Sequence, residues 1–376
     1  MPREARPNLA SIQYLRAAAA MAVVFFHANG ISQEYFGNFR AGFGAAGVDV
    51  FFVVSGFIMW VTASNRAAPE FMRNRIVRIV PLYWGLTLLL YAGWALAKTP
   101  PAFADLLKSL LFIPHISART GEINPLLIVG WTLNFEMFFY ALFAASLFFS
   151  KAWRAPVLFV AMAGLVATGL LLLPGDGPVQ KVYTSPLIIE FALGCLLGIF
   201  YQRGTMPRPS VGGSVGCAGL LLLLATDGSA ADLSTVRLLH WGLPAFLIVI
   251  GALSFEPLQK PQSFLMLLGA ASYSVYLVHP IVIAALKDAT LVIGIGSVDL
   301  SSGFILLAIT ASISVGIIVY WLVESPVSSI LKKHQISVAS HASRTSTISA
   351  ISQRRLVTPE AIAGVVRSVL WMRTKL

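Results

Sequence analysis

Ten apolar segments run through this sequence, and they constrain its fold more than any other feature. A helix needs about 20 mostly apolar residues to cross a bilayer. Only 11% of the residues are charged, whereas soluble domains carry about 25%. We therefore predict an all-α integral membrane protein with about ten transmembrane helices. The predicted spans are residues 9–28, 45–64, 77–97, 126–149, 155–173, 184–202, 211–226, 238–255, 264–286 and 303–323.

The charges between these segments predict the orientation of the chain. Lysine and arginine gather in alternate loops, and such loops face the cytoplasm in membrane proteins. Ten spans would place both termini on that basic side, so both termini are predicted to be cytoplasmic. Lys181 and Arg237 are assigned to loops on the opposite side. The segment 105–116 is too short to span, and we expect an interfacial or re-entrant piece there.

The chain changes character near residue 328, which suggests three regions. Residues 1–328 form the predicted transmembrane domain, and residues 329–358 form a basic, serine-rich linker that we expect to be disordered in the cytoplasm. Residues 359–376 are expected to form an amphipathic helix on the membrane surface. The formal net charge of +11 fits a membrane protein with asymmetric loops, so no nucleic-acid partner is expected.

Six ionisable residues lie inside the predicted spans. Each charge there costs about 2.5–3.5 kcal/mol on insertion scales, so such residues usually face a cavity and mark function. In the predicted topology, Arg16 lies on or near the cytoplasmic side together with Arg75 and Arg78, whereas the acids and histidines lie at mid-depth or in the outer half. This order predicts an anionic ligand held from the cytoplasmic side and acid–base chemistry beyond it. The six residues are Arg16, His27, Asp49, Glu136, Glu190 and His279.

Arg16 and His27 are eleven residues apart on the first span. Eleven steps of about 100° end about 20° past three full turns, and they rise about 16.5 Å. The two side chains should therefore share one face of the helix. Plainer interpretations also exist: Arg16 could form a structural ion pair, Asp49 could cap the second span, and His279 could bond a neighbouring helix.

Several segments resemble one known family, the acyltransferase 3 family, in the family's own order over about residues 9–328. An arginine followed after ten residues by a histidine is its hallmark, and the segment "RIVR" resembles the family's paired arginines. Two departures are that Glu136 has no second acid beside it and that Ser325 stands where a basic residue is common. The matching segments are "YLRAAAAMAVVFFHA" (14–28), "GVDVFFVVSGFIM" (47–59), "FMRNRIVRIVPLYW" (71–84), "WTLNFEMFFY" (131–140), "LGAASYSVYLVHPIV" (268–282) and "VESPV" (323–327).

The resemblance implies transfer of an acyl group, usually acetyl, from cytoplasmic acyl-coenzyme A to a hydroxyl group of a cell-surface or exported glycan. It also implies a place in the inner (plasma) membrane, and it is nearest to the branch that acetylates exopolysaccharide. No metal is expected. Arginine forms bidentate bonds with phosphate, so Arg75 and Arg78 are expected to bind the phosphates of coenzyme A, with Arg16 deeper in the bundle.

Histidine is the usual base for a weakly nucleophilic hydroxyl group, so we expect His27 to be the base. Asp49 is the expected orienting partner of His27, and Glu136 is expected to stabilise the protonated histidine or to fix the acceptor hydroxyl group. His279 is expected to act either as a second base or as a donor to the developing oxyanion. An acyl-histidine intermediate remains an open alternative.

Two non-enzymatic functions fit the same composition. Ten spans with buried charges are also found in secondary transporters and glycan flippases, which bind their substrates near the middle of the membrane. A non-catalytic membrane partner of a polysaccharide export complex is the other alternative. Against a transporter, the sequence shows no pair of interrupted spans in corresponding halves.

Overall fold

A computed structural model describes residues 9–36, 42–172, 177–226, 235–259, 261–293, 301–327 and 329. The chain divides into a long unit, Met1–Glu324, and a C-terminal unit, Ser325–Leu376. The predicted linker at 329–358 (apart from residue 329) and the predicted surface helix at 359–376 lie outside the described residues, so both stay predictions. The architecture and the site described below belong to the long unit.

The described part of the long unit is built from helices and loops, with one isolated β-bridge between Ile116 and Ile123. The longer helices are α1 (Ala10–Phe36), α2 (Gly47–Ala63), α3 (Ala68–Leu96), α5 (Trp131–Ser146), α6 (Lys151–Ala167), α8 (Ile188–Gln202), α9 (Pro209–Leu224), α11 (Leu243–Ser254), α12 (Ser263–Ile293) and α13 (Ser301–Val319). The shorter elements are η1 (Gly42–Ala46), α4 (Phe103–Leu110), η2 (Ile128–Gly130), η3 (Thr168–Leu172), α7 (Pro178–Tyr183), α10 (Thr235–Arg237), η4 (Leu238–Gly242), η5 (Glu256–Leu258) and η7 (Tyr320–Glu324).

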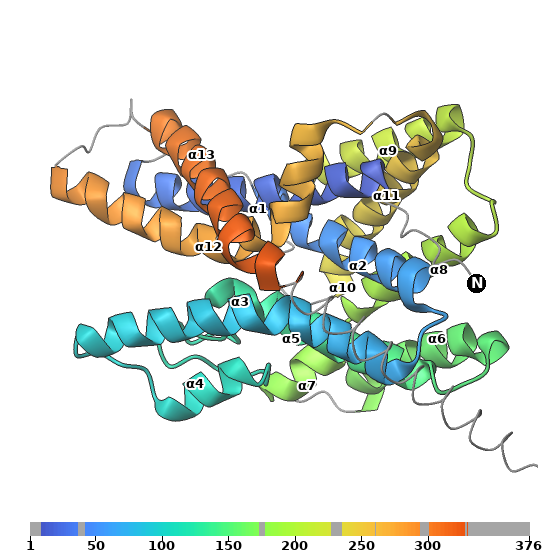
Figure 1. Cartoon of the computed structure of the whole chain (residues 1–376), viewed down its shortest axis with the longest axis horizontal. Helices are drawn as coiled ribbons and strands as arrows, with labels where there is room; N and C mark the ends of the chain where they lie inside the picture. The colour runs from blue at the N-terminus through green and yellow to red at the C-terminus, as the bar shows by residue number, and fades with distance from the viewer. Residues whose placement is uncertain are drawn as a thin grey trace, which may run out of the picture. The chain divides into compact units, whose positions relative to one another are not determined.

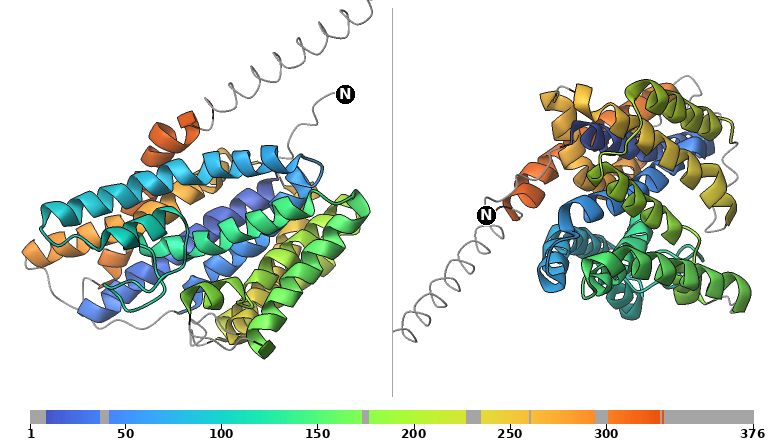
Figure 2. Two further views of the ribbon diagram at one scale, coloured as in Figure 1. Left: turned by 90° about the horizontal axis from the view of Figure 1, so that it is seen from below. Right: turned by 90° about the vertical axis from the view of Figure 1, so that its right-hand side faces the viewer.

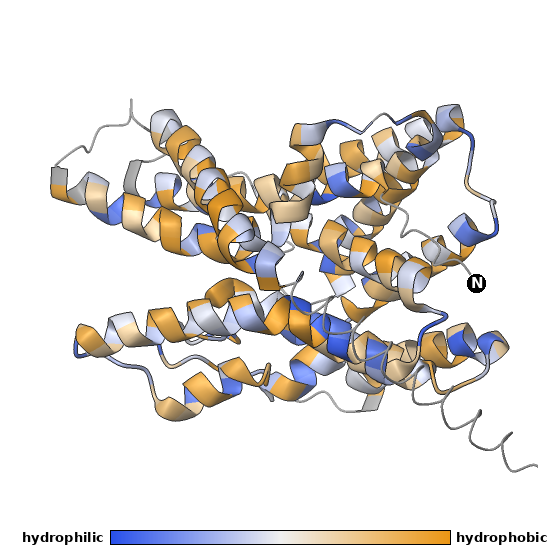
Figure 3. Ribbon diagram, in the orientation of Figure 1, coloured by the Kyte–Doolittle hydropathy of each residue, from blue (hydrophilic) through white to orange (hydrophobic). Residues whose placement is uncertain are grey.

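The prediction of an all-α membrane protein is confirmed. Nine helical segments among the described residues are long and apolar enough to cross a membrane, and apolar residues dominate the helices in Figure 3. The predicted seventh span corresponds to α9, which is apolar but has only 16 residues. At 1.5 Å per residue, α9 is about 24 Å long, which is short for a bilayer core of about 30 Å.

The direction of the helices indicates that α9 also crosses. Gly269 of α12 lies against the backbone of Gln13 in α1, and farther along His27 lies against His279, so the two helices are parallel. Figures 1 and 2 show α12 (orange) beside α1 (dark blue). Each crossing reverses the direction of the chain, so two parallel spans need an odd number of crossings between them. Seven apolar helical segments lie between α1 and α12 when α9 is included, and six when it is not. This count agrees with the ten predicted spans. The cytoplasmic side remains a prediction.

The segment expected to lie at the interface contains the short helix α4 and an irregular stretch after it. Leu106 and Ser109 of α4 are buried, whereas Phe103 and Leu107 are exposed. Tyr83 and Trp84 of α3 hold the end of this helix, because their side chains donate hydrogen bonds to the carbonyl groups of residues 109 and 110. The helix is therefore attached to α3, and its position in a membrane remains a prediction.

Small residues bring α2 and α8 into backbone contact. A Cβ atom on Gly56 would overlap the carbonyl oxygen of Phe191, and one on Gly194 would overlap the carbonyl oxygen of Val53. Such contacts are common between membrane helices, where small residues let the backbones approach closely. The contact fixes α2, which carries three site residues described below.

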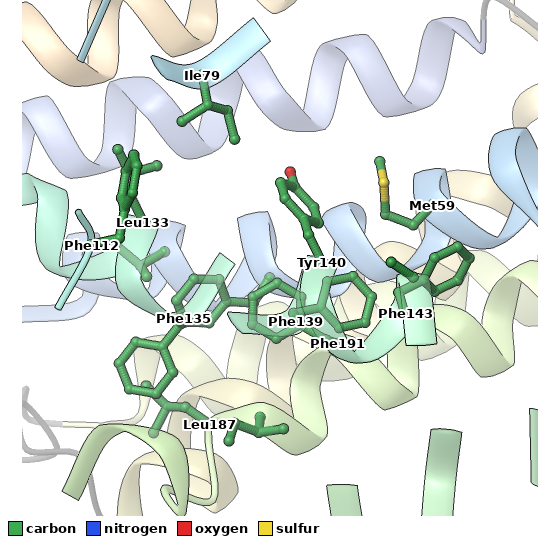
Figure 4. Packing of buried hydrophobic residues seen from close by; sticks show 14 of the residues in the cluster. Met59, Ile79, Phe112, Leu133, Phe135, Phe139, Tyr140, Phe143, Leu187 and Phe191 are labelled. Atoms are coloured by element: carbon green, nitrogen blue, oxygen red, sulfur yellow. The ribbon is translucent and has the colours of Figure 1, made fainter. Parts of the chain in front are cut away.

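An aromatic cluster joins α2 and α8 to α5. The ring of Phe191 stacks on Phe52 at 4.6 Å and on Phe139 at 4.5 Å between centroids. Figure 4 shows Phe135, Phe139 and Phe143 of α5 in one row near Phe191, with Tyr140 pointing away from that row. Since a helix repeats every 3.6 residues, α5 presents the phenylalanines to the core and turns Tyr140 toward the site.

We expect Gly194→Leu to destabilise the folded protein by at least about 1–3 kcal/mol, because the α2–α8 contact has no room for a side chain. Gly164→Leu on α6 is the matched control, because a Cβ atom there meets nothing within 4 Å. The fraction of protein that stays monodisperse in detergent after heating measures the effect. Equal stability of the two variants would contradict this packing.

Candidate active site

Three cavities follow one another through the long unit. The arginine cavity, of about 280 Å³, is lined by Arg16, Arg75 and Arg78 among others. The same three arginines also line the central cavity, which is narrow at about 90 Å³. Val48 and Tyr276 line both the central cavity and the histidine cavity, which has a volume of about 770 Å³. Of the predicted site residues, Arg16, Arg75, Arg78 and Glu136 line the first two cavities and His27 lines the third, whereas Asp49 and His279 are not among the described lining residues.

The arginine cavity combines several cations without an opposing acid. The Arg16 side chain donates to Ser272 Oγ at 2.9 Å and to Gln13 Oε1 at 3.3 Å. Arg75 lies 5.8 Å from the ring of Tyr140, and its buried Nε atom has no hydrogen-bond partner in the described residues. Within those residues, Arg16, Arg75 and Arg78 have no carboxylate within salt-bridge distance. Cations arranged in this way are chemically suited to an anionic ligand.

Glu136 lines the central cavity, beyond these arginines. Its Oε1 atom accepts hydrogen bonds from the Tyr140 hydroxyl group and from Ser55 Oγ, the latter at 3.1 Å. Tyr276 separates this cavity from the next, and its hydroxyl group is fixed by Val129 O and Thr132 Oγ1, both at 3.1 Å. Glu136 and His27 line different cavities, and no hydrogen bond between them is found in the described residues, so the expected roles of Glu136 toward His27 or an acceptor hydroxyl group stay predictions.

His27 and His279 meet at the histidine cavity. His279 Nε2 lies 3.2 Å from His27 Nδ1, and the ring centroids are 4.9 Å apart. His27 lines the cavity, whereas His279 is fully buried behind it and is not among the described lining residues. His279 therefore faces the other histidine rather than the cavity space, which does not fit the expected oxyanion donor.

The surroundings of His27 select one tautomer. His27 Nδ1 lies 3.0 Å from Val23 O, and a carbonyl oxygen only accepts hydrogen bonds, so Nδ1 carries the proton. His279 Nε2 then accepts from the same N–H group. The Nε2 atom of His27 is left with a lone pair, as a general base requires.

Asp49 does not orient His27, which corrects the expected pairing. Its two carboxylate oxygens accept hydrogen bonds from Arg237 Nε at 3.1 Å and from an Arg237 terminal nitrogen at 2.8 Å. The pair is almost fully buried, at 0% and 3% exposure of the side chains. Arg237 also lies over Trp131 and Trp241, at 5.4 and 4.8 Å from the ring centroids.

Arg237 was missed as a site residue because the sequence placed it in a loop. In the structure α10 continues through the π-helical turn η4 into α11, so Arg237 lies inside a helical segment. Its position directly before the apolar run "LLHWGLPAF" was the available signal. Glu324 is likewise held inside the long unit, because its buried carboxylate accepts a hydrogen bond from Ser274 Oγ at 2.6 Å.

A bundle of apolar helices enclosing such a series of ionisable residues defines a multi-pass membrane protein with an enzyme-like site. Comparison with known proteins gives its family. A family model described as an acyltransferase domain, that of acyltransferase 3, matches residues 9–323. The chain belongs to the acyltransferase 3 family, as its sequence segments predicted, and it is an enzyme that transfers acyl groups other than aminoacyl groups.

Three curated relatives share this similarity. The chain is 41% identical to the exopolysaccharide production protein ExoZ of Rhizobium meliloti (strain 1021) over 75% of this chain and 89% of ExoZ. It is 24% identical to the peptidoglycan O-acetyltransferase OatA of Listeria monocytogenes over 74% of this chain and 50% of OatA. It is 27% identical to the acyltransferase MdmB of Streptomyces mycarofaciens over 75% of this chain and 80% of MdmB. No solved structure matches.

Proposed function

We propose that the protein is an O-acyltransferase of the inner (plasma) membrane. It moves an acyl group, acetyl in the first instance, from cytoplasmic acyl-coenzyme A to a hydroxyl group of an exported or cell-surface glycan. The observation that carries this proposal is the series of neighbouring cavities, with arginines that have no carboxylate within salt-bridge distance at one end and His27 at the other. The name of the relative ExoZ supports an exopolysaccharide as the glycan.

The donor would bind from the arginine cavity. Coenzyme A carries several phosphate groups, and Arg75 and Arg78 are suited to hold them by charge-assisted hydrogen bonds. Arg16, like Arg75 and Arg78, lines both the arginine and the central cavity, and its side chain contacts Ser272 of the central cavity, so it would bind where the donor enters the bundle. The thioester arm would extend through the central cavity, where Glu136 can accept a hydrogen bond from an amide N–H group of the arm.

Acyl transfer would occur near His27. The acceptor oxygen attacks the thioester carbonyl carbon while His27 Nε2 takes the hydroxyl proton. The new carbon–oxygen bond forms, the carbon–sulfur bond breaks, and the leaving thiolate takes up a proton as free coenzyme A. His279 would hold the His27 ring in this orientation and accept its Nδ1–H, as the third member of a catalytic triad does. A two-step route through an acyl-histidine uses the same nitrogen.

The loss of the His27 base should abolish acylation without affecting glycan export. In a strain lacking the gene, we expect His27→Ala to leave the surface glycan without its ester groups but in normal amount, because general bases contribute about 10²–10⁴-fold to rate. His240→Ala is the matched control, because this exposed histidine is not among the residues that line the histidine cavity.

Ester content by mass spectrometry and total glycan from the same cells distinguish the alternatives. Near-normal esterification by the His27→Ala variant at equal membrane abundance would contradict the proposed base. Loss of the whole polymer in the deletion strain would instead favour a transporter, a flippase or an export partner.

Removal of the cavity arginines should weaken donor binding in particular. We expect Arg75→Gln and Arg78→Gln each to raise the KM for acetyl-coenzyme A by about 10- to 100-fold. This is the loss of affinity expected when one hydrogen bond to a charged group is removed. Rates at saturating donor should fall much less. Arg73→Gln is the matched control, because Arg73 is an exposed arginine of the same helix that is not among the lining residues. Equal loss of rate at all donor concentrations would point to a folding role.

A further inference from the structure

The histidine cavity differs in its chemistry from the arginine cavity. Its described lining contains charges of both signs, from Glu122, Lys181 and Arg237, together with the aromatic rings of Trp131 and Tyr276. The described lining of the arginine cavity contains arginines and no acid. A sugar hydroxyl group both donates and accepts hydrogen bonds. Mixed charge beside aromatic surface therefore suits a neutral, polyhydroxylated ligand.

The volume of the histidine cavity is also suitable. At about 770 Å³ it lies within the range of about 300–1,000 Å³ that is usual for small-molecule sites. The central cavity, at about 90 Å³, is too small for a sugar ring with its substituents. Because His27 lines the larger cavity, a ligand bound there can present a hydroxyl group to the base.

Arg237 is a firmly held polar group on this wall. Two hydrogen bonds to Asp49 fix the plane of its guanidinium group, and Trp131 and Trp241 lie against it. A buried ion pair recovers its desolvation cost only when its geometry is very good, and it often adds little net stability. A guanidinium group fixed in this way, on the wall of the cavity that the proposed base also lines, therefore needs a reason beyond holding helices together.

We propose that the histidine cavity is the acceptor-sugar site and that Arg237 binds a sugar hydroxyl group there. Asp49 is then a positioning residue that acts through Arg237 and not through His27. This inference rests on the proposed acyl transfer and adds to it where the acceptor binds. It separates the donor from the acceptor, with Tyr276 between the two ends of the cavity series.

The test uses the purified full-length protein, acetyl-coenzyme A as donor, and oligosaccharides cut from the host's de-esterified surface polysaccharide as the acceptor probe. We expect Arg237→Gln to raise the acceptor KM by about 10- to 100-fold, as for loss of a hydrogen bond to a charged group. The donor KM should stay near the wild-type value. Arg119→Gln is the matched control, because Arg119 also lies over a tryptophan but is not among the residues that line the cavity.

The paired variant Asp49→Asn/Arg237→Gln distinguishes binding from a purely structural role. Asp49→Asn alone should lower thermal stability, since it removes the carboxylate that forms the salt bridge with the buried guanidinium group. In the double variant, we expect stability to recover and the acceptor KM to stay raised. Recovery of both would overturn the inference, as would an Arg237→Gln variant with a wild-type acceptor KM. Wild-type protein that transfers nothing from acetyl-coenzyme A would overturn the proposed function, and this inference with it.

Discussion

The parallel packing of α1 against α12 is the contact on which the site depends. Gly269 lets the two backbones meet at Gln13, and Arg16 and His27 both contact α12, through Ser272 and His279. The two contacts lie about three helical turns apart on α1. The same interface therefore fixes the positions of Arg16 in the arginine cavity and of His27 in the histidine cavity. A shift of α12 along α1 would therefore disturb donor binding and the base at the same time.

Electrostatics divide the cavity series into two regions. At one end, Arg16, Arg75 and Arg78 have no carboxylate within salt-bridge distance in the described residues, although Glu136 lines the central cavity with them. Three positive charges with one acid nearby are costly inside a membrane unless an anion binds there. At the other end, Asp49 forms an ion pair with Arg237. The guanidinium group therefore adds little net charge and would act as a hydrogen-bond donor of fixed orientation. This contrast supports an anionic donor at one end and an uncharged acceptor at the other.

Local sequence patterns were sufficient for some of these features. Helical periodicity predicted that Arg16 and His27 share one face, and apolar length predicted α9 even though that helix is short. The partners of these residues were not predictable, because they depend on packing between distant segments. Arg237 is 188 residues away from Asp49, and His279 is 252 residues away from His27. The interpretation of Arg237 as a loop residue failed because the π-helical turn η4 extends α11 outward to include it.

The central claim is that one bundle joins a donor on one side of the membrane to an acceptor on the other. The direct measurement uses proteoliposomes of known protein orientation, with de-esterified oligosaccharide trapped inside and acetyl-labelled acetyl-coenzyme A outside. When the arginine cavity faces outward, we expect the label on the trapped oligosaccharide, and His27→Ala should abolish it. Labelling only when the donor and the acceptor are on the same side of the bilayer would contradict the account.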